Sequence, residues 1–309
     1  MLISTNQRTL EKSVSFSGIG LHSGRKVHLT LKPAPPNHGI KFKRTDLPNM
    51  PVIPALFQMV VDTSLATVIG EEGAIVSTVE HLMASLTGMG VDNALVELDA
   101  HEVPVMDGSA KLFTSMIKKA GIVEQKSPRF CFLVKEPIEI TDGDRFAAVY
   151  PSDTFKITCT IDFAHPIIGI QSFSVDVEPE SFEKDIAPAR TFCHFKEIEY
   201  MKQDGLALGG SLENAIVHDG EKVLNPDGLR FKDEFVRHKI LDCIGDFSLL
   251  GMPFLGHMVV KKSGHMFNHL FLKEFFTRKK SWDTVLMSDA FPPEDPGKRD
   301  YSAVRSVAL

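Results

Sequence analysis

The sequence contains no apolar run that approaches the roughly 18 residues of a transmembrane helix. Its first residues, MLISTNQRTLEKS, also lack the apolar core of a secretory signal peptide. We therefore expect a cytoplasmic protein without a transmembrane segment.

Cysteine is scarce, and basic residues are not in excess. The four cysteines are widely separated and form no Cys-x-x-Cys pair of the metal-binding or redox type, which fits a reducing compartment. With 34 Lys and Arg against 40 Asp and Glu, the formal net charge is −6. Because nucleic-acid-binding surfaces are basic, we expect no nucleic acid partner, although local Lys or Arg residues remain able to hold a phosphate. A His-Glu-x-x-His motif is also absent.

The composition is that of a folded globular protein. Hydrophobic residues make up 43% of the 309 residues and charged residues 24%. A chain of this length has room for two ordinary domains or one large one, each with a sizeable core.

Hydrophobic periodicity predicts the same order of elements in both halves of the chain, namely several strands followed by a helix, a strand and a helix. The stretch QKSPR, residues 125–129, is the candidate linker between them. The repeated order suggests a duplication, although no sequence repeat proves it. The strands are expected at residues 13–17, 27–31, 40–44, 94–99, 130–140, 146–150, 155–162, 172–177 and 255–260. The helices are expected at residues 78–87, 110–120, 195–203, 233–251 and 268–278.

Residues 233–251, DEFVRHKILDCIGDFSLLG, have the periodicity of one amphipathic helix. Its apolar residues share one face, whereas His238, Asp242 and Asp246 are four residues apart and line another. Such a polar stripe is usually a solvated face. An imidazole and a carboxylate one turn apart are also placed to bind a metal ion from one side. This helix alone leaves both interpretations open.

The stretch STVEHL, residues 77–82, also has two interpretations. Ser77 followed three residues later by Glu80 is the pattern of a capping box, in which Glu80 bonds a backbone N–H at the helix start. Alternatively, His81 supplies a metal ligand and Glu80 acts as a base toward a metal-activated water.

Two shorter stretches carry weaker signals. His265 ends KKSGH, a predicted loop whose Ser-Gly pair allows backbone to approach a ligand closely, although a loop histidine is usually just solvated. Thr191 in ARTF is able to donate a hydrogen bond, but an isolated threonine is more often structural.

Seven motifs stand in one order along the chain. They are GIGLHSG (18–24), TVEHL (78–82), PVMDGSA (104–110), ARTF (189–192), LGGS (208–211), GLRFKDEFVRHKILDCIGD (228–246) and KSGH (262–265). In this order and spacing they closely resemble the UDP-3-O-acyl-N-acetylglucosamine deacetylase family, the zinc amidases of lipid A biosynthesis. The resemblance covers residues 6–285.

The resemblance implies one Zn²⁺ ion per chain, held by His81, His238 and Asp242. Three protein ligands leave a fourth position for water, as a catalytic zinc site requires. Glu80 falls on the position of the family's general base.

The resemblance also assigns three further catalytic positions. His265 falls on the residue that protonates the leaving amine or holds the oxyanion, and Asp246 on the residue that orients it. Thr191 falls on the donor to the tetrahedral oxyanion that forms when hydroxide attacks the acetamide carbonyl.

Nine positions match substrate contacts of the family. The expected contacts to the pyrophosphate or other polar groups are Lys239, Lys262 and His22. The expected contacts to the sugar or uridine are Phe192, Asp162 and Phe163. Ile198, Ala207 and Ser211 fall where the family builds a tunnel for the acyl chain.

The chain departs from the family pattern next to two motifs. After ARTF the family commonly has Gly-Phe, whereas this chain has Cys193 and His194, a change at the tunnel. After KSGH the chain has Met266 and Phe267, which are bulkier than the expected Ala-Leu. Cys243 follows Asp242, but its helical angle directs it to the core, so it is not counted as a ligand.

We therefore expect an α+β fold of two similarly folded domains, each a β-sheet with a helical layer. The helices are expected to pack between the two sheets, with the active site at the domain interface. The expected boundaries are 1–126 and 127–290, followed by an extended or mobile tail, 291–309.

The expected function is zinc-dependent hydrolysis of the N-acetyl group of UDP-3-O-(3-hydroxyacyl)-N-acetylglucosamine, which releases acetate in the committed step of lipid A biosynthesis. The UDP-linked acylated glucosamine is the expected partner, and the protein is expected to be a monomer. Two alternatives are a zinc amidase for another acylated sugar or a peptide, and a non-catalytic sugar-nucleotide or acyl-chain binding protein. The second alternative predicts loss of a metal ligand or of Glu80, and the chain retains all of them.

Overall fold

The computed structural model describes residues 4–290, so the expected tail at 291–309 lies outside the described residues. Within that described part, no helix combines the length and the apolar character needed to cross a membrane.

The first half of the chain is built on a five-stranded sheet whose central strand, β9, lies antiparallel to β3 and parallel to β4. Alternate residues of β3 (Val27, Leu29 and Leu31) are fully buried, because successive side chains of a strand point to opposite faces. The strands run in the order β2 (Val14–Ile19), β3 (Lys26–Pro33), β9 (Ala94–Leu98), β4 (Ile40–Arg44) and β5 (Val52–Pro54).

The second half repeats this topology around β18, which lies antiparallel to β13 and parallel to β14. The corresponding strands are β12 (Ile138–Asp142), β13 (Arg145–Tyr150), β18 (Phe254–Lys261), β14 (Phe155–Asp162) and β15 (Ile170–Asp176). The strands β11 (Phe130–Val134) and β19 (Trp282–Leu286) extend the same sheet. The expectation of two similarly folded halves is confirmed, and the shared strand order is the structural repeat that the sequence did not show.

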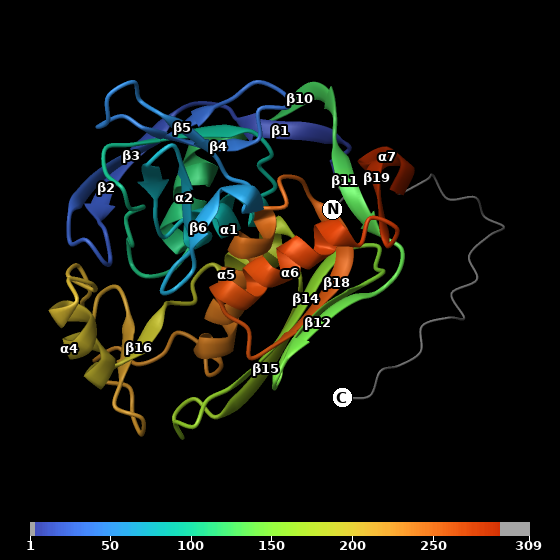
Figure 1. The fold of residues 1–309 in the computed structure, drawn as a ribbon. Helices are drawn as coiled ribbons and strands as arrows, with labels where there is room; N and C mark the ends of the chain where they lie inside the picture. Colours follow the sequence, from blue (N-terminus) through green and yellow to red (C-terminus); the bar gives the residue numbers. More distant parts are fainter. Residues whose placement is uncertain (1–3, 291–309) are drawn as a thin grey trace.

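Four helices pack between the two sheets (Figure 1). They are α1 (Glu80–Gly88), α2 (Lys111–Ala120), α5 (Glu234–Ser248) and α6 (His265–Thr277). Each half therefore contributes a helix, its central strand and a second helix in that order. The contact between α1 and α5 joins the two halves. Together with α6, β14 and β15, α1 buries nearly all of α5, including its polar stripe.

The crossing of α1 and α5 requires a glycine on α5. A Cβ atom added to Gly245 would lie 2.1 Å from the Glu80 carbonyl oxygen, far inside van der Waals contact. Gly245 therefore allows the start of α1 to lie directly on the backbone of α5.

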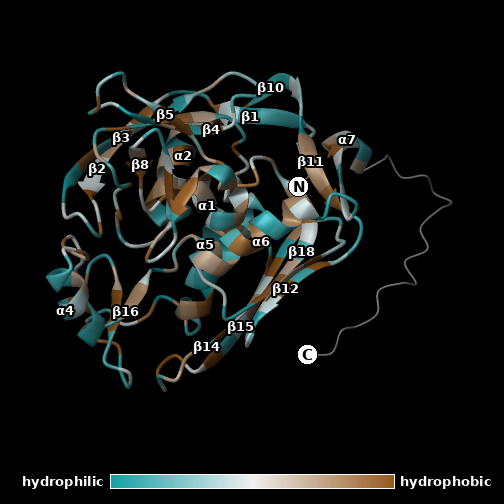
Figure 2. Cartoon of the chain, viewed as in Figure 1, coloured by the Kyte–Doolittle hydropathy of each residue, from teal (hydrophilic) through white to brown (hydrophobic). Residues whose placement is uncertain are grey.

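Shorter elements surround this sandwich. Their bounds are β1 (Asn6–Leu10), η1 (Phe57–Met59), β6 (Val60–Asp62), β7 (Val68–Glu71), β8 (Ala74–Val76), β10 (Ile122–Pro128), α3 (Pro179–Ser181), η2 (Phe182–Ile186), β16 (Phe192–His194), α4 (Phe195–Gln203), β17 (Ile216–His218) and α7 (Met287–Ala290). The strands β1 and β10 pair antiparallel, so most of the stretch expected to be a linker, residues 125–129, is part of a strand. α4 has no buried residue, and Figure 2 shows it as mostly hydrophilic.

Candidate active site

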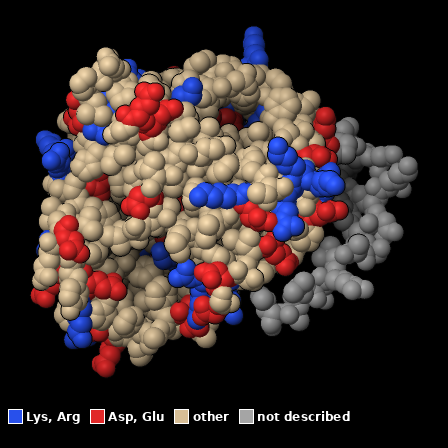
Figure 3. All heavy atoms as spheres, viewed as in Figure 1, with Lys and Arg blue, Asp and Glu red and all other residues tan. Residues whose placement is uncertain are grey.

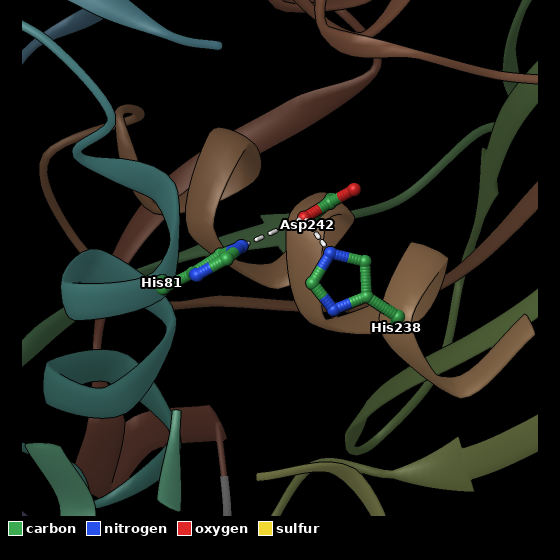
Figure 4. A group of neighbouring side chains, drawn as sticks. All are labelled: His81, His238 and Asp242. Atoms are coloured by element: carbon green, nitrogen blue, oxygen red, sulfur yellow. Dashed lines mark ion pairs between the residues drawn. The ribbon is translucent and has the colours of Figure 1, made fainter. Parts of the chain in front are cut away.

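Three buried side chains from the two halves meet where α1 crosses α5. His81 comes from α1, and His238 and Asp242 come from α5 (Figure 4). Each residue offers one possible ligand atom, a nitrogen or an oxygen, and these three atoms all lie within 4.8 Å of one another. Asp242 Oδ1 is 3.5 Å from His81 Nε2 and 3.3 Å from His238 Nε2. The interpretation of the stripe as a solvated face is therefore wrong.

The protonation of His238 suits a metal ligand. Its Nδ1 donates a hydrogen bond of 3.1 Å to the carbonyl oxygen of Ala189, which leaves the Nε2 lone pair facing Asp242. Burial lowers the pKa of His238 to about 3, so the ring is neutral near pH 7. A neutral imidazole is the form that binds a metal ion. With three ligands from the chain, a fourth position would stay open for water.

Asp242 is held in place by a lysine on its second oxygen. Lys239 Nζ lies 2.9 Å from Asp242 Oδ2, and it also lies 5.5 Å from the centre of the Phe192 ring. Burial opposes ionisation of Asp242, but the adjacent His238 and Lys239 outweigh it and hold the pKa well below its ordinary value. Asp242 is therefore an anionic ligand at neutral pH.

Glu80 stands beside these ligands as a buried carboxyl group, only 4% exposed. The first residue of α1 is Glu80 itself, and no side-chain hydrogen bond caps the helix, so the predicted capping box is not formed. Instead, Glu80 Oε2 accepts a hydrogen bond of 3.1 Å from the backbone N–H of Thr67. Burial raises the pKa of Glu80 against the opposing effect of His265 and His81, which is the direction expected of a general base.

His265 faces Glu80 from the start of α6. Its Nε2 is 3.9 Å from Glu80 Oε1, and its Nδ1 is 2.9 Å from Asp246 Oδ2. Burial lowers the pKa of His265, but the charge and hydrogen bond of Asp246 outweigh it, and with Glu80 they raise the pKa to about 10. His265 is thus a proton donor near neutral pH.

Two residues of this group were not expected from the sequence. The hydroxyl of Thr67 donates to Asp246 Oδ1 at 2.6 Å, and the amide of Asn268 donates to Asp246 Oδ2 at 2.7 Å. Both side chains are almost fully buried. Asn268 lies one turn after His265 on the same helix and was in principle detectable, whereas nothing near Thr67 in the sequence distinguishes it.

The segment that carries Thr191 is fixed by backbone hydrogen bonds. The Thr191 N–H donates to the Gly108 carbonyl in the PVMDGSA loop at 2.8 Å, and its carbonyl accepts from Ile216 at 2.7 Å. The next residue, Phe192, has its ring centre 6.2 Å from that of His238. The structure therefore brings the ARTF motif up to the metal-ligand group.

The residues expected at the sugar and uridine lie next to Phe192. The rings of Phe163 and Phe192 are 5.7 Å apart, and Asp162 precedes Phe163 at the end of β14. Lys262 Nζ forms ion pairs with Asp162 at 2.8 Å and with Asp144 at 2.7 Å. Lys262, like Lys239, is thus paired with a carboxylate.

The turn that contains His22 packs against the LGGS turn. The N–H of Leu208 donates to the His22 carbonyl at 3.2 Å, next to Ala207, which is buried. The His22 N–H donates at 2.7 Å to Glu102, a buried residue that the sequence did not indicate. Ser211 closes the LGGS turn through its N–H, which donates to Asn214 Oδ1.

Ile198 lies on α4, which extends to one side of the two sheets together with β16 (Figure 1). The strand β17 pairs with β16. His194, the departure from the family pattern, begins this helix. Its Nδ1 accepts a hydrogen bond from the Lys196 N–H, and its ring stacks on His165 with centres 4.9 Å apart. An imidazole thus provides a ring at the position where the family commonly has phenylalanine.

Comparisons with known proteins agree with this geometry. The family model that matches, over residues 7–277, is described as LpxC, UDP-3-O-acyl N-acetylglycosamine deacetylase. The UDP-3-O-acyl-N-acetylglucosamine deacetylase of Myxococcus xanthus (strain DK1622) is 54% identical over 282 residues, which are 91% of this chain and 90% of that protein. The protein of the same name from Syntrophus aciditrophicus (strain SB) is 44% identical over 301 residues, 97% of this chain and 96% of that protein. With a family match over most of its length and relatives at this identity, the chain belongs to the UDP-3-O-acyl N-acetylglycosamine deacetylase family, whose members are metal-dependent hydrolytic deacetylases.

Proposed function

We propose that this protein hydrolyses the N-acetyl group of UDP-3-O-(3-hydroxyacyl)-N-acetylglucosamine and releases acetate, in the committed step of lipid A biosynthesis. The observation that carries the proposal is the convergence of His81, His238 and Asp242 with Glu80 and His265 in one buried group. The names of the relatives support the substrate class and the reaction.

We propose one Zn²⁺ ion per chain as the cofactor. Two imidazoles and one carboxylate are a common ligand set of catalytic zinc sites. When bound, the ion supplies Lewis-acid chemistry, by lowering the pKa of a water molecule and polarising the acetamide carbonyl. The neutral His238 and the ionised Asp242 are both in the protonation states that such an ion requires.

The residues of the chain account for the proton transfers. Glu80 takes a proton from the attacking water, a role supported by its burial and raised pKa. His265, protonated near pH 7, donates to the leaving nitrogen, and Asp246 positions its ring. Thr191 donates to the oxyanion. Water and the amide are thereby converted to acetate and a free amine.

Polar contacts to the substrate are assigned to Lys239, Lys262 and His22. The Nδ1 atom of His22 is buried and finds no hydrogen-bond partner among residues 4–290, so a polar group of the substrate would satisfy it. Phe192, Phe163 and Asp162 are assigned to the sugar or uridine, and Ile198, Ala207 and Ser211 to the acyl chain. We propose domains at 1–126 and 127–290, and a monomer that works in the cytoplasm, where nucleotide-activated sugars are made.

The proposal is tested by measuring acetate release from the UDP-linked substrate and from the same acylated sugar without UDP. We expect the UDP-linked compound to be strongly preferred. Equal rates would instead identify an amidase that does not recognise the nucleotide, the first of the alternatives above.

The Glu80→Gln variant tests the catalytic assignment. We expect acetate release to fall at least about 100-fold, because a general base contributes about 10²–10⁴-fold. Metal content is measured on the same sample, and Glu97→Gln, on β9 and paired with Lys32, serves as the matched control. Full turnover by Glu80→Gln with metal bound would overturn the assignment.

A further inference from the structure

A cavity lies between the two halves of the chain, where the chain crosses from the first sheet to the second. Its volume is about 870 Å³, within the range of about 300–1,000 Å³ typical of ligand pockets. None of the residues assigned above to the metal, the proton transfers or the substrate lines it. In Figure 3 the surface is hollowed near the top of the view, in the region of β1 and β10 of Figure 1. The cavity is therefore separate from the candidate active site.

Most of the cavity wall is apolar and comes from both halves. Ile40 and Val91 line it from the first half, and Phe155, Phe254 and Met287 from the second. Burying an alkyl chain against such a wall is favourable, because each CH₂ group is removed from water. The wall therefore suits a hydrocarbon chain.

One part of the wall is positively charged. Arg8 and Arg129 both line the cavity, and Asp92 lies between them. Arg129 Nε pairs with Asp92 Oδ1 at 2.8 Å, whereas Asp92 Oδ2 accepts from the backbone N–H of Arg8. The Arg8 guanidinium donates to the Met89 carbonyl and has no carboxylate oxygen within 4.0 Å among residues 4–290.

All lining residues taken together also carry more positive than negative charge. Lys41 adds a third cation to Arg8 and Arg129, whereas the lining carboxylates are Asp92 and Glu178. A guanidinium without a paired carboxylate binds carboxylate or phosphate oxygens through charge-assisted hydrogen bonds. Arg129 follows the last residue of β10, where the second half begins, and Arg8 lies on β1, the strand that pairs with β10.

We propose that this cavity binds a single-chain amphipathic anion, with its alkyl chain on the apolar wall and its carboxylate or phosphate head group at Arg8. Because the lining residues come from both halves, the bound molecule bridges them. Occupancy therefore stabilises the folded protein, as any ligand of the native state does.

Calorimetric titration of the full chain tests the proposal with three ten-carbon probes, namely decanoate, decyl phosphate and 1-decanol, each below its aggregation threshold. We expect one equivalent of an anion to bind and to raise the melting temperature, and 1-decanol to bind at least tenfold more weakly. The tighter of the two anions identifies the head group as carboxylate or phosphate. Equal affinity for all three probes, or no binding of either anion, would overturn the proposal.

Two variants locate the binding. Arg8→Met keeps an apolar stem but removes the charge, so we expect the preference for anions over 1-decanol to fall at least tenfold. Thr284→Trp places a ring on the wall of the cavity from an exposed position of β19, and we expect it to abolish binding.

Thr141→Trp, at an exposed position of β12 outside the lining, is the matched control and should bind normally. Acetate release is measured on all variants, and an unchanged rate shows that the active site is intact. Unchanged anion affinity in Thr284→Trp would place the binding elsewhere, including the proposed acyl tunnel, and would refute the cavity as the site.

Discussion

At the scale of single residues, the surroundings of His265 decide its charge. The Asp246 carboxylate accepts from its Nδ1, and this pair raises the His265 pKa to about 10 although burial acts in the opposite direction. The ordinary pKa of histidine is about 6.5. In the metal-free protein, His265 therefore contributes stability that is fully present below about pH 6.5 and is lost as the pH rises through about 10.

The first prediction concerns the Asp246→Asn variant. Removing the carboxylate leaves burial as the main influence on the ring, so the His265 pKa falls and the proton donor is lost at lower pH. We expect the alkaline limb of log kcat/KM against pH to move to lower pH. A bound divalent cation repels the His265 proton and moves this limb to lower pH in both proteins. The variant and the wild type are therefore compared at the same metal loading.

Asn268→Ala is the control for this prediction, because it removes another partner of Asp246 but no charge. Its alkaline limb should move less than that of Asp246→Asn. An unchanged limb in Asp246→Asn would show that another group controls the alkaline loss of activity.

At the scale of elements, the crossing of α1 and α5 positions the catalytic carboxyl group. Gly245 lies against the backbone of Glu80, so the place of Glu80 depends on how closely the two helices approach. An added methyl group at Gly245 would have to displace backbone, not a flexible side chain.

The second prediction concerns Gly245→Ala. We expect a loss of about 1–3 kcal/mol in the free energy of unfolding, the usual cost of overpacking, together with lower kcat. Denaturant unfolding measures the first and acetate release the second. Gly264→Ala, where an added Cβ meets no atom within 4 Å, should be far closer to the wild type in stability. Equal stabilities of the two variants would contradict the close approach.

The GIGLHSG turn depends on a residue far away in the sequence. Glu102 accepts hydrogen bonds from the N–H groups of His22 and Ser23 at 2.7 and 2.8 Å and from the Thr78 hydroxyl at 3.3 Å. Thr78 has a positive φ of 58° just before α1, so Glu102 connects this turn to the segment that leads into Glu80.

The third prediction concerns Glu102→Gln. The amide keeps one acceptor oxygen, so one partly buried N–H of the turn loses its partner at a cost of about 1 kcal/mol, the low end of the range for a buried group. We expect KM for the UDP-linked substrate to rise more than kcat falls, because the change loosens the turn of His22. Steady-state kinetics and denaturant unfolding test this, with Glu97→Gln as control. A fall in kcat alone would argue that Glu102 acts through α1 instead of through the turn.

At the scale of the whole molecule, the metal ligands join the two halves. His81 belongs to the first half, and His238 and Asp242 to the second. A metal ion bound to all three therefore stabilises the assembled sandwich. On the face shown in Figure 3, Lys and Arg side chains lie among Asp and Glu side chains, so the net negative charge is not gathered into one patch there.

The fourth prediction concerns removal of the metal. We expect chelation to abolish acetate release and to lower the melting temperature, and Zn²⁺ to restore both. A ligand at 100 times its Kd adds about 2.7 kcal/mol to the free energy of unfolding. In His81→Ala, added Zn²⁺ should raise the melting temperature less than in the wild type. Full activity of the chelated protein would refute the metal-dependent mechanism.

The sequence alone allowed the main elements to be predicted, because their signals are local. The helix periodicity placed His238, Asp242 and Asp246 on one side of α5, and the order of the motifs led to the family. The short strands β6, β7 and β8 were missed, because three or four residues carry little periodicity. Thr67 was missed for a related reason, since its partner Asp246 is 179 residues away.

The local spacing of side chains was thus determined by the sequence itself, because the geometry of a helix is the same wherever it lies. Only the tertiary structure decided that the stripe of α5 faces α1 and not water. It also decided that Glu80 accepts from Thr67 instead of capping its own helix. Both outcomes depend on which surfaces pack together, and packing joins residues whose separation along the chain carries no signal.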